Sequence, residues 1–90
     1  MQQVQPLTPA MLKVHQRGVV EVFNALWACG VSHGDIALRN LGLSCNAVCI
    51  YDLGRTHDHT HDGIDSAQAA LAARQRDLPS LETLLASARL

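Results

Sequence analysis

Apolar residues recur at helical spacing in the first third of the chain. The pattern follows Thr8-Pro9, and a Thr cap with Pro at the first helical position is typical of a helix start. Gly30 fits a helix stop, and Gly18 weakens the middle by up to about 1 kcal/mol relative to Ala. The spacing therefore predicts a helix between Thr8 and Gly30 with an apolar face of Leu12, Val19, Val22, Phe23 and Leu26.

Shorter apolar runs follow, of the length of strands. Leu41–Leu43 and Ala47–Tyr51 are typical of two short strands. The triplet Ser44-Cys45-Asn46 between them resembles a turn, which predicts a small β-hairpin. Val31-Ser32 has the length of no more than a strand fragment.

The last third is first polar and then rich in Ala. Arg55–Asp65 is a polar connection, and Ser66–Arg76 favours a helix by its propensities. Pro79 is expected to break or restart this helix, which then continues over Ser80–Arg89. Together the three parts predict an α+β fold.

Composition narrows the class of protein. Ninety residues make one domain at most, and 48% hydrophobic residues argue against disorder. Aromatic residues make up only 3%, the net charge is −1 and no basic run exists, so no nucleic-acid or anionic-membrane partner is indicated. Without a run of about 18 apolar residues or a basic-then-apolar leader, we infer neither a membrane span nor a signal peptide.

The cysteines and the first residues suggest the setting of the domain. Cys29, Cys45 and Cys49 cannot all pair within one chain, so we expect reduced, buried thiols and an intracellular, cytoplasmic protein. Met1–Leu7 is polar and Gln-rich and is expected to be a frayed lead-in. The domain itself is then expected to span residues 8–90.

Polar side chains gather in the stretch "VSHGDIALRN", where burial without partners would be costly. The order is His33-Gly34-Asp35, four residues, Asn40, the hairpin, and then Asp52-Leu53-Gly54. This order resembles the protein-kinase-like superfamily, whose pattern is H-R-D-x-x-x-x-N followed by a hairpin and D-F-G. The helix ahead of the loop also fits, so the resemblance covers roughly Thr8 to Gly54. Each motif alone would also fit an ordinary turn in which an Asp caps its own backbone.

The resemblance implies roles for individual residues. Asp35 would orient the substrate hydroxyl and accept its proton, and Arg39 matches the A-A-R-N form of many tyrosine kinases. Asn40 and Asp52 would hold the Mg²⁺ that accompanies ATP, because Mg²⁺ takes oxygen ligands. By the same resemblance, structural roles fall to two further residues. His33 would pack the loop against the segment around Asp52, and Gly54 would let the backbone turn where a side chain would clash.

Several departures from the family pattern limit the expected activity. Gly34 replaces an Arg, and H-G-D also occurs in aminoglycoside and choline phosphotransferases, which leaves the branch open. No G-x-G-x-x-G loop exists, and the only Lys, Lys13, lies in the predicted helix, so it cannot be the strand lysine that holds the phosphates. The segment that would grip ATP is therefore missing from this sequence, and no A-P-E follows Gly54.

A second match to the family lies near the end of the chain. Asp77-Leu78-Pro79-Ser80-Leu81 is similar to the D-x-W-S-L start of the family's central helix. In the family that Asp holds the backbone of the catalytic loop, which would give Asp77 a structural role. The alternative is an amphipathic surface helix.

The polar stretch "THDHTHDGID" forms a separate cluster of metal-ligand types: His57, His59, His61, Asp58, Asp62 and Asp65. Imidazoles and carboxylates at such spacing can bind Zn²⁺ or similar ions. The stretch looks like the metallo-β-lactamase signature H-x-H-x-D-H, but its last two residues stand in reverse order. We expect an exposed, irregular loop without a preformed tetrahedral site.

The sequence thus predicts the central part of a kinase-like large lobe: helix, catalytic-type loop, small hairpin and C-terminal helices. Its best functional interpretation is a truncated kinase-like protein with little activity of its own. Intact relatives would transfer phosphate from ATP to a hydroxyl group, with a protein hydroxyl as the favoured acceptor. The alternatives are a pseudokinase-type binding module that meets a protein partner through an exposed apolar surface, a fragment of a small-molecule phosphotransferase, and metal binding through His57–His61.

Overall fold

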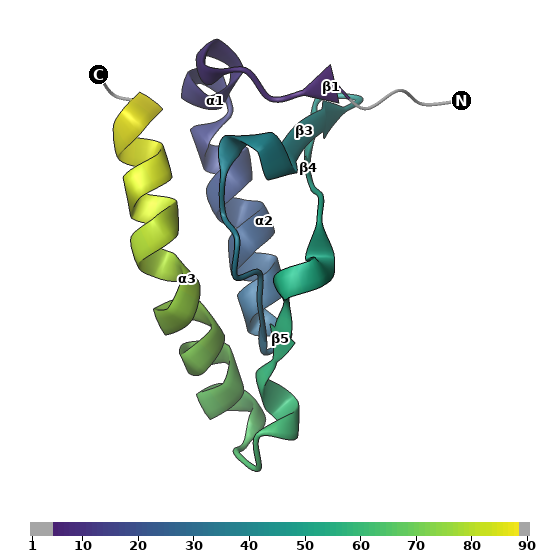
Figure 1. The fold of residues 1–90 in the computed structure, drawn as a ribbon, viewed down its shortest axis with the longest axis vertical. Helices are drawn as coiled ribbons and strands as arrows, with labels where there is room; N and C mark the ends of the chain where they lie inside the picture. Colours follow the sequence, from purple (N-terminus) through teal and green to yellow (C-terminus); the bar gives the residue numbers. More distant parts are fainter. Residues whose placement is uncertain (1–4, 89–90) are drawn as a thin grey trace.

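The computed structural model describes residues 5–88 and shows a small α+β domain. Its helices are α1 (Pro9–Val14), α2 (Gln16–Ala28) and α3 (Ser66–Ala88). A three-stranded antiparallel sheet has the order β1 (Gln5–Pro6), β3 (Leu41–Ser44), β4 (Ala47–Ile50), and β2 (Val31–Ser32) pairs separately with β5 (His57–Asp58). Figure 1 shows α2 and α3 side by side, with the segment between β2 and β3 passing over α2.

The first predicted helix is divided in two. The hydroxyl of Thr8 accepts a hydrogen bond from the N–H of Met11, as expected for a cap. Helical geometry is interrupted at His15, where φ is −105° and ψ is 21°, and a second helix then runs to Ala28. The prediction of one continuous helix was therefore wrong. Neither Pro nor Gly marks the break, so the apolar spacing could not reveal it.

The predicted hairpin is present with a shorter loop. Ser44 pairs with Ala47, which leaves Cys45 and Asn46 as a two-residue loop. Both have positive φ, 51° and 65°, as a type I′ turn requires. The start of the chain differs from the expected frayed lead-in, because β1 pairs with β3 and Leu7 is buried. Residues 1–4 lie outside the described part of the chain.

One helix replaces the two predicted around Pro79. α3 runs without interruption from Ser66 to Ala88, with Pro79 inside it. Arg89 lies outside the described residues. A proline inside a helix costs about 3 kcal/mol, but burying one Leu side chain returns roughly 1.5–3 kcal/mol. The buried face of α3 offsets that cost with a stripe that extends on both sides of Pro79: Ala69, Ala73, Asp77, Leu81, Leu85 and Ala88.

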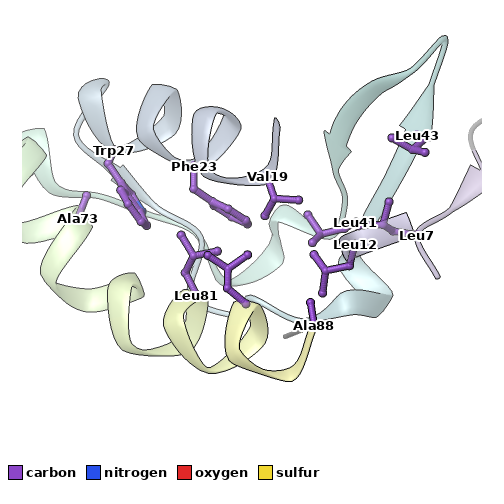
Figure 2. Packing of buried hydrophobic residues seen from close by; sticks show 11 residues of the cluster. Leu7, Leu12, Val19, Phe23, Trp27, Leu41, Leu43, Ala73, Leu81 and Ala88 are labelled. Atoms are coloured by element: carbon purple, nitrogen blue, oxygen red, sulfur yellow. The ribbon is translucent and has the colours of Figure 1, made fainter. Parts of the chain in front are cut away.

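The core lies between α2, α3 and the N-terminal sheet. Val19, Phe23 and Trp27 recur every fourth residue on α2 and are all buried. Figure 2 shows Phe23 and Trp27 directed toward α3, where Leu81 faces them, while Leu41 and Leu12 continue the cluster toward the sheet. The core thereby covers the inner side of the loop that follows β2.

Two further expectations concern thiols and membranes. The thiols were expected to be buried, but Cys29 and Cys45 are exposed and Cys49 is partly so. Cys29 follows the last residue of α2, Cys45 lies in the two-residue hairpin loop, and Cys49 lies on β4. None of the helices within residues 5–88 is long and apolar enough to cross a lipid bilayer.

Candidate functional site

A buried carboxylate organises the loop that follows β2. Asp77 lies on the inner face of α3 and is therefore only 2% exposed. Its Oδ2 accepts hydrogen bonds from the indole N–H of Trp27 at 2.9 Å and from the backbone N–H of His33 at 2.6 Å. Its Oδ1 accepts a third from the backbone N–H of Gly34 at 3.0 Å. Hydrogen bonds of this kind to a charged group are stronger than neutral ones, so α3 holds the loop backbone at two consecutive residues.

Gly34 is required by the backbone at this point. Its φ is +83°, a region that residues with a Cβ rarely adopt. A Cβ built there would lie 2.5 Å from the carbonyl oxygen of Arg55 and 3.1 Å from the guanidinium of Arg76. The segment after β4 and the side of α3 therefore close in on the loop, and only glycine fits between them.

His33 links the loop to the residue before Asp52. It is fully buried, and its Nδ1 accepts a hydrogen bond from the N–H of Asp35 at 3.1 Å. That leaves Nε2 to carry the proton, which it donates to the carbonyl oxygen of Tyr51 at 2.9 Å. The edge of the ring meets Phe23, with centroids 6.1 Å apart and planes at 86°. His33 thus contacts the segment around Asp52, and the role that the resemblance gives it stays a prediction.

Asp35, Arg39 and Asn40 form one hydrogen-bonded unit. Arg39 Nη2 lies 2.7 and 2.9 Å from the two carboxylate oxygens of Asp35. Asn40 is buried, and its Nδ2 donates to Asp35 Oδ2 at 3.1 Å and to the Asp35 carbonyl at 2.8 Å. Partial burial opposes the charge of Asp35, but the hydrogen bonds from Asn40 and Arg39 outweigh it and hold the pKa of this carboxyl below its usual value. The carboxylate is therefore ionised and oriented.

Asp52 lies immediately after the hairpin in an unusual backbone conformation. Its φ is +56° and its ψ is 74°, in the left-handed region. Its carboxylate is exposed and accepts a long hydrogen bond, 3.4 Å, from the N–H of Gly54. Gly54 itself has no positive φ, and a Cβ there would approach only that carboxylate, at 3.3 Å. The turn that the sequence assigned to Gly54 is thus made by Asp52.

The oxygen atoms that Mg²⁺ would need are only partly brought together. Asn40 uses its amide nitrogen in both of its hydrogen bonds, which leaves Oδ1 as the atom that a metal could use. The N–H of Tyr51 donates a hydrogen bond to the carbonyl of Asn40 at 2.7 Å. This backbone contact brings Asp52, which is the next residue along the chain, close to Asn40. Within residues 5–88, the carboxylate of Asp52 is hydrogen-bonded to Gly54 and not to Asp35 or Asn40. Amide and carboxylate oxygens are ligand types that suit a hard cation such as Mg²⁺. Of the three residues, however, only Asp35 and Asn40 contact each other directly.

The histidine stretch is more ordered than expected. Asp58 begins the short 3₁₀ turn η3 (His59–His61), and its carboxylate accepts from the N–H of Thr60 at 3.0 Å. His59 is 9% exposed, and its backbone N–H donates to the carbonyl of Gly30 at 2.8 Å. His57, His59 and Asp62 place ligand atoms within 4.8 Å of one another. The expectation of an exposed, irregular segment was therefore wrong for His59, because β5 pairs with β2 and draws this residue inward.

A groove of about 480 Å³ lies next to the loop. Its walls are residues 36–38 on one side and one face of α3 on the other, with Pro79, Ser80, Thr83, Leu84 and Ser87. The groove starts at the residue after Asp35, although Asp35 itself does not line it.

Sequence reasoning missed the partners of the motif residues. The indole of Trp27 donates to Asp77, and the carbonyl of Tyr51 accepts from His33. Arg76 donates to the buried hydroxyl of Ser32 at 2.8 Å. Trp27 could have been found as the next residue of the α2 stripe, four positions after Phe23. Nothing in the sequence marks Arg76 or Ser32, since their contact joins residues 44 positions apart.

Comparison of the chain with protein-family models, curated proteins and solved structures finds no match.

Proposed function

We propose that this chain carries the catalytic and metal-binding segment of a kinase-like phosphotransferase. Such an enzyme transfers phosphate from ATP to a hydroxyl group, and a protein hydroxyl is the acceptor we favour. The observation that carries the proposal is the contact of Asp77 with the backbone of His33 and Gly34. This contact spans more than 40 residues and is the one that the family resemblance assigns to Asp77. A chance H-x-D turn would have no reason to be held by a buried carboxylate from a distant helix.

The unit around Asp35 has the properties that phosphoryl transfer needs. Such transfer depends on positioning and charge neutralisation more than on covalent chemistry. The carboxylate of Asp35 is ionised and fixed by Arg39 and Asn40. In the proposed reaction it orients the acceptor hydroxyl and takes up its proton, as a positioned base can. The exposed Arg39 contacts both oxygens of the carboxylate and so favours one orientation of it.

Asn40 and Asp52 are the residues that would hold Mg²⁺, through the amide oxygen and the carboxylate. When bound, the ion neutralises charge on the phosphates of the nucleotide. The left-handed backbone of Asp52 supports this role, because strained conformations of residues other than glycine cluster at functional sites. The carboxylate of Asp52 also accepts a hydrogen bond from the N–H of Gly54 and so closes the turn in which it lies.

The groove beside the loop is the surface on which an acceptor would lie. Ile36, Ala37 and Leu38 directly follow Asp35 and form one of its walls. An acceptor with an apolar part in this groove could present its hydroxyl to Asp35. The residues that grip ATP in the family are absent from this sequence, and Lys13 lies on the exposed side of α1. The proposed segment therefore needs a nucleotide-gripping part supplied from outside residues 1–90.

Manganese, a paramagnetic substitute for Mg²⁺, tests the metal ligands directly. The amide resonances near Asn40 and Asp52 should broaden with Mn²⁺ and recover with excess Mg²⁺, and the effect should be lost in Asp52→Asn. The experiment uses the Asp62→Asn background, so that the histidine stretch does not compete for the ion. Glu21→Gln, which alters an exposed acid on α2, is the matched control. Equal broadening in Asp52→Asn and in the control would reject the assignment of the metal ligands.

A further inference from the structure

We propose that His57, His59 and Asp62 form a Zn²⁺ site, with one coordination position left for water. The site is independent of the proposed phosphotransferase function, since it shares no residue with the unit around Asp35. Its three side chains come from β5, η3 and the residue that follows η3. Two imidazoles and one carboxylate are a common ligand set for Zn²⁺ with an open position.

The atoms that would bind the ion already face one another. His57 Nε2 lies 2.8 Å from Asp62 Oδ2, and His59 Nδ1 lies 3.4 Å from the same oxygen. Tetrahedral ligands about 2.0–2.1 Å from Zn²⁺ are roughly 3.3–3.4 Å apart. The distance between His59 and Asp62 therefore already suits the ion. The exposed side chain of His57 has to move, because its Nε2 lies closer than that to Asp62 Oδ2 and the three ligand atoms lie within 4.8 Å of one another.

His59 is the anchor of the site because its other ring nitrogen is also held. Its Nε2 lies 2.9 Å from the hydroxyl of Ser32, which is fully buried. That hydroxyl also accepts a hydrogen bond from Arg76 Nη1 at 2.8 Å. A ligating histidine usually donates its second N–H to a carboxylate, a carbonyl or a water, which fixes the orientation and tautomer of the ring, and here the Ser32 hydroxyl oxygen takes that place. This arrangement is what separates the cluster from an accidental group of surface histidines.

The Ser32 hydroxyl is compatible with both forms of His59. Without metal, Nδ1 carries the proton toward Asp62 and Nε2 accepts from the hydroxyl. With metal, Nδ1 must be free of the proton, which then lies on Nε2 and is donated to the hydroxyl oxygen. A hydroxyl can donate and accept, so the oxygen of Ser32 keeps its place while its hydrogen rotates away from Nε2.

His61 lies beside the site but outside it. Its Nε2 contacts Asp58 Oδ2 at 3.2 Å, and its side chain is 82% exposed. It has the same residue type as His57, lies four residues further along the chain in η3, and contacts a different carboxylate. His61 is therefore the matched control for His57.

Zinc competition against a chromophoric chelator tests the site in the full chain after removal of bound metals. We expect one equivalent of Zn²⁺ to bind and the melting temperature to rise, because an ion that binds only the folded state stabilises it. His57→Ala and Asp62→Asn should each weaken binding by about tenfold or more, whereas His61→Ala should leave the affinity within about twofold. Cobalt should give d–d absorption bands that disappear in the same two variants.

The Ser32 contact provides a second, independent readout. Ser32→Ala is expected to weaken zinc binding by about 10- to 100-fold without removing a ligand. If that variant fails to fold by circular dichroism, the two surface variants still decide the outcome. Equal losses in His61→Ala and His57→Ala, or absence of stoichiometric binding, would overturn the proposal.

Discussion

At the residue scale, the loop geometry depends on a few side chains that satisfy buried backbone groups. Asp77 serves three N–H donors at once, and two of them belong to the loop backbone. His33 joins the same loop to Tyr51. The motif residues that would carry chemistry, Asp35 and Asn40, therefore rest on a frame of buried polar contacts.

Replacing Asp77 by Ala should destabilise the fold strongly. The change leaves buried N–H groups without an acceptor, and each such group costs roughly 1–3 kcal/mol. We expect the free energy of unfolding to fall by about 3 kcal/mol or more, measured by urea denaturation followed by circular dichroism. Glu82→Ala, on the exposed face of the same helix, should change it by less than about 0.5 kcal/mol. Similar effects of both substitutions would show that the Asp77 contacts do not hold the loop.

Two glycines with positive φ separate backbone strain from steric conflict. Gly63→Ala should cost about 1–2 kcal/mol, because its φ is +76° and nothing lies within 4 Å of the added Cβ. Gly34→Ala should cost a further 1–3 kcal/mol or so, because its Cβ meets the Arg55 carbonyl. Thermal melts of both variants check the order. Equal losses would mean that the loop can move away from Arg55.

The low pKa of Asp35 predicts a defined response to acid. The folded-state pKa of Asp35 lies below the ordinary pKa of an aspartate side chain, so this carboxyl stabilises the fold at pH values above that ordinary pKa. The contribution is lost as the pH falls through the folded-state pKa. A carboxyl-carbon NMR titration should show a midpoint below that of an unstructured aspartate, and the midpoint should rise in Arg39→Gln. Arg17→Gln, whose partner is Glu21, should leave the midpoint unchanged, and a shift in that control would point to general charge effects.

At the element scale, α3 shows packing that overrides local preference. Its proline lies in mid-helix, yet the helix continues because buried residues lie on both sides of it. α3 contributes Asp77 to the loop, one wall to the groove and Arg76 to Ser32. The position of this one helix therefore determines the surroundings of both candidate sites.

Pro79→Ala should stabilise the protein. A proline inside a helix costs about 3 kcal/mol relative to Ala, and its restriction of the unfolded chain returns only about 0.4–1 kcal/mol. Because Pro79 is exposed, little packing is lost, and we expect a gain of about 2 kcal/mol in chemical denaturation. Ser80→Ala, the exposed neighbour, should change stability by no more than about 0.5 kcal/mol. A loss of stability in Pro79→Ala would mean that the proline sets a bend that the core needs.

At the scale of the whole molecule, residues 5–88 share a core on which both candidate sites lie. The core joins α1, α2, α3, β3 and the residue after β1. The loop with Asp35 lies over this core, and the histidine stretch lies beside β2, which leads into the loop. Binding of an ion at the second site would therefore stabilise the strand pair from which the loop begins.

The isolated chain should neither bind ATP nor transfer phosphate. In the kinase family a glycine-rich cover and a strand lysine grip the nucleotide, and this sequence has neither. Mg²⁺ in such sites is bound partly by the phosphates of the substrate, so Asn40 and Asp52 cannot by themselves replace the missing nucleotide-binding residues. We expect no heat of binding in calorimetry with Mg²⁺ and ATP at roughly millimolar concentration. At that concentration the measurement detects a binding free energy of about −4 kcal/mol or more favourable. If the chain does transfer phosphate, Asp35→Asn should abolish it, and activity that survives would show that Asp35 is the wrong residue.

The sequence by itself determined the helical stretches, the hairpin and the motif order, because these depend on local rules. Apolar spacing, the Thr8-Pro9 start and the hairpin are set by neighbours within a few residues. The break at His15 and the continuity of α3 through Pro79 were decided by packing, which local propensity does not contain. The partners of the site residues were likewise decided only in three dimensions. Asp77 meets His33 and His59 meets Ser32 across 44 and 27 residues, and a buried polar group must find its partner wherever the core places it.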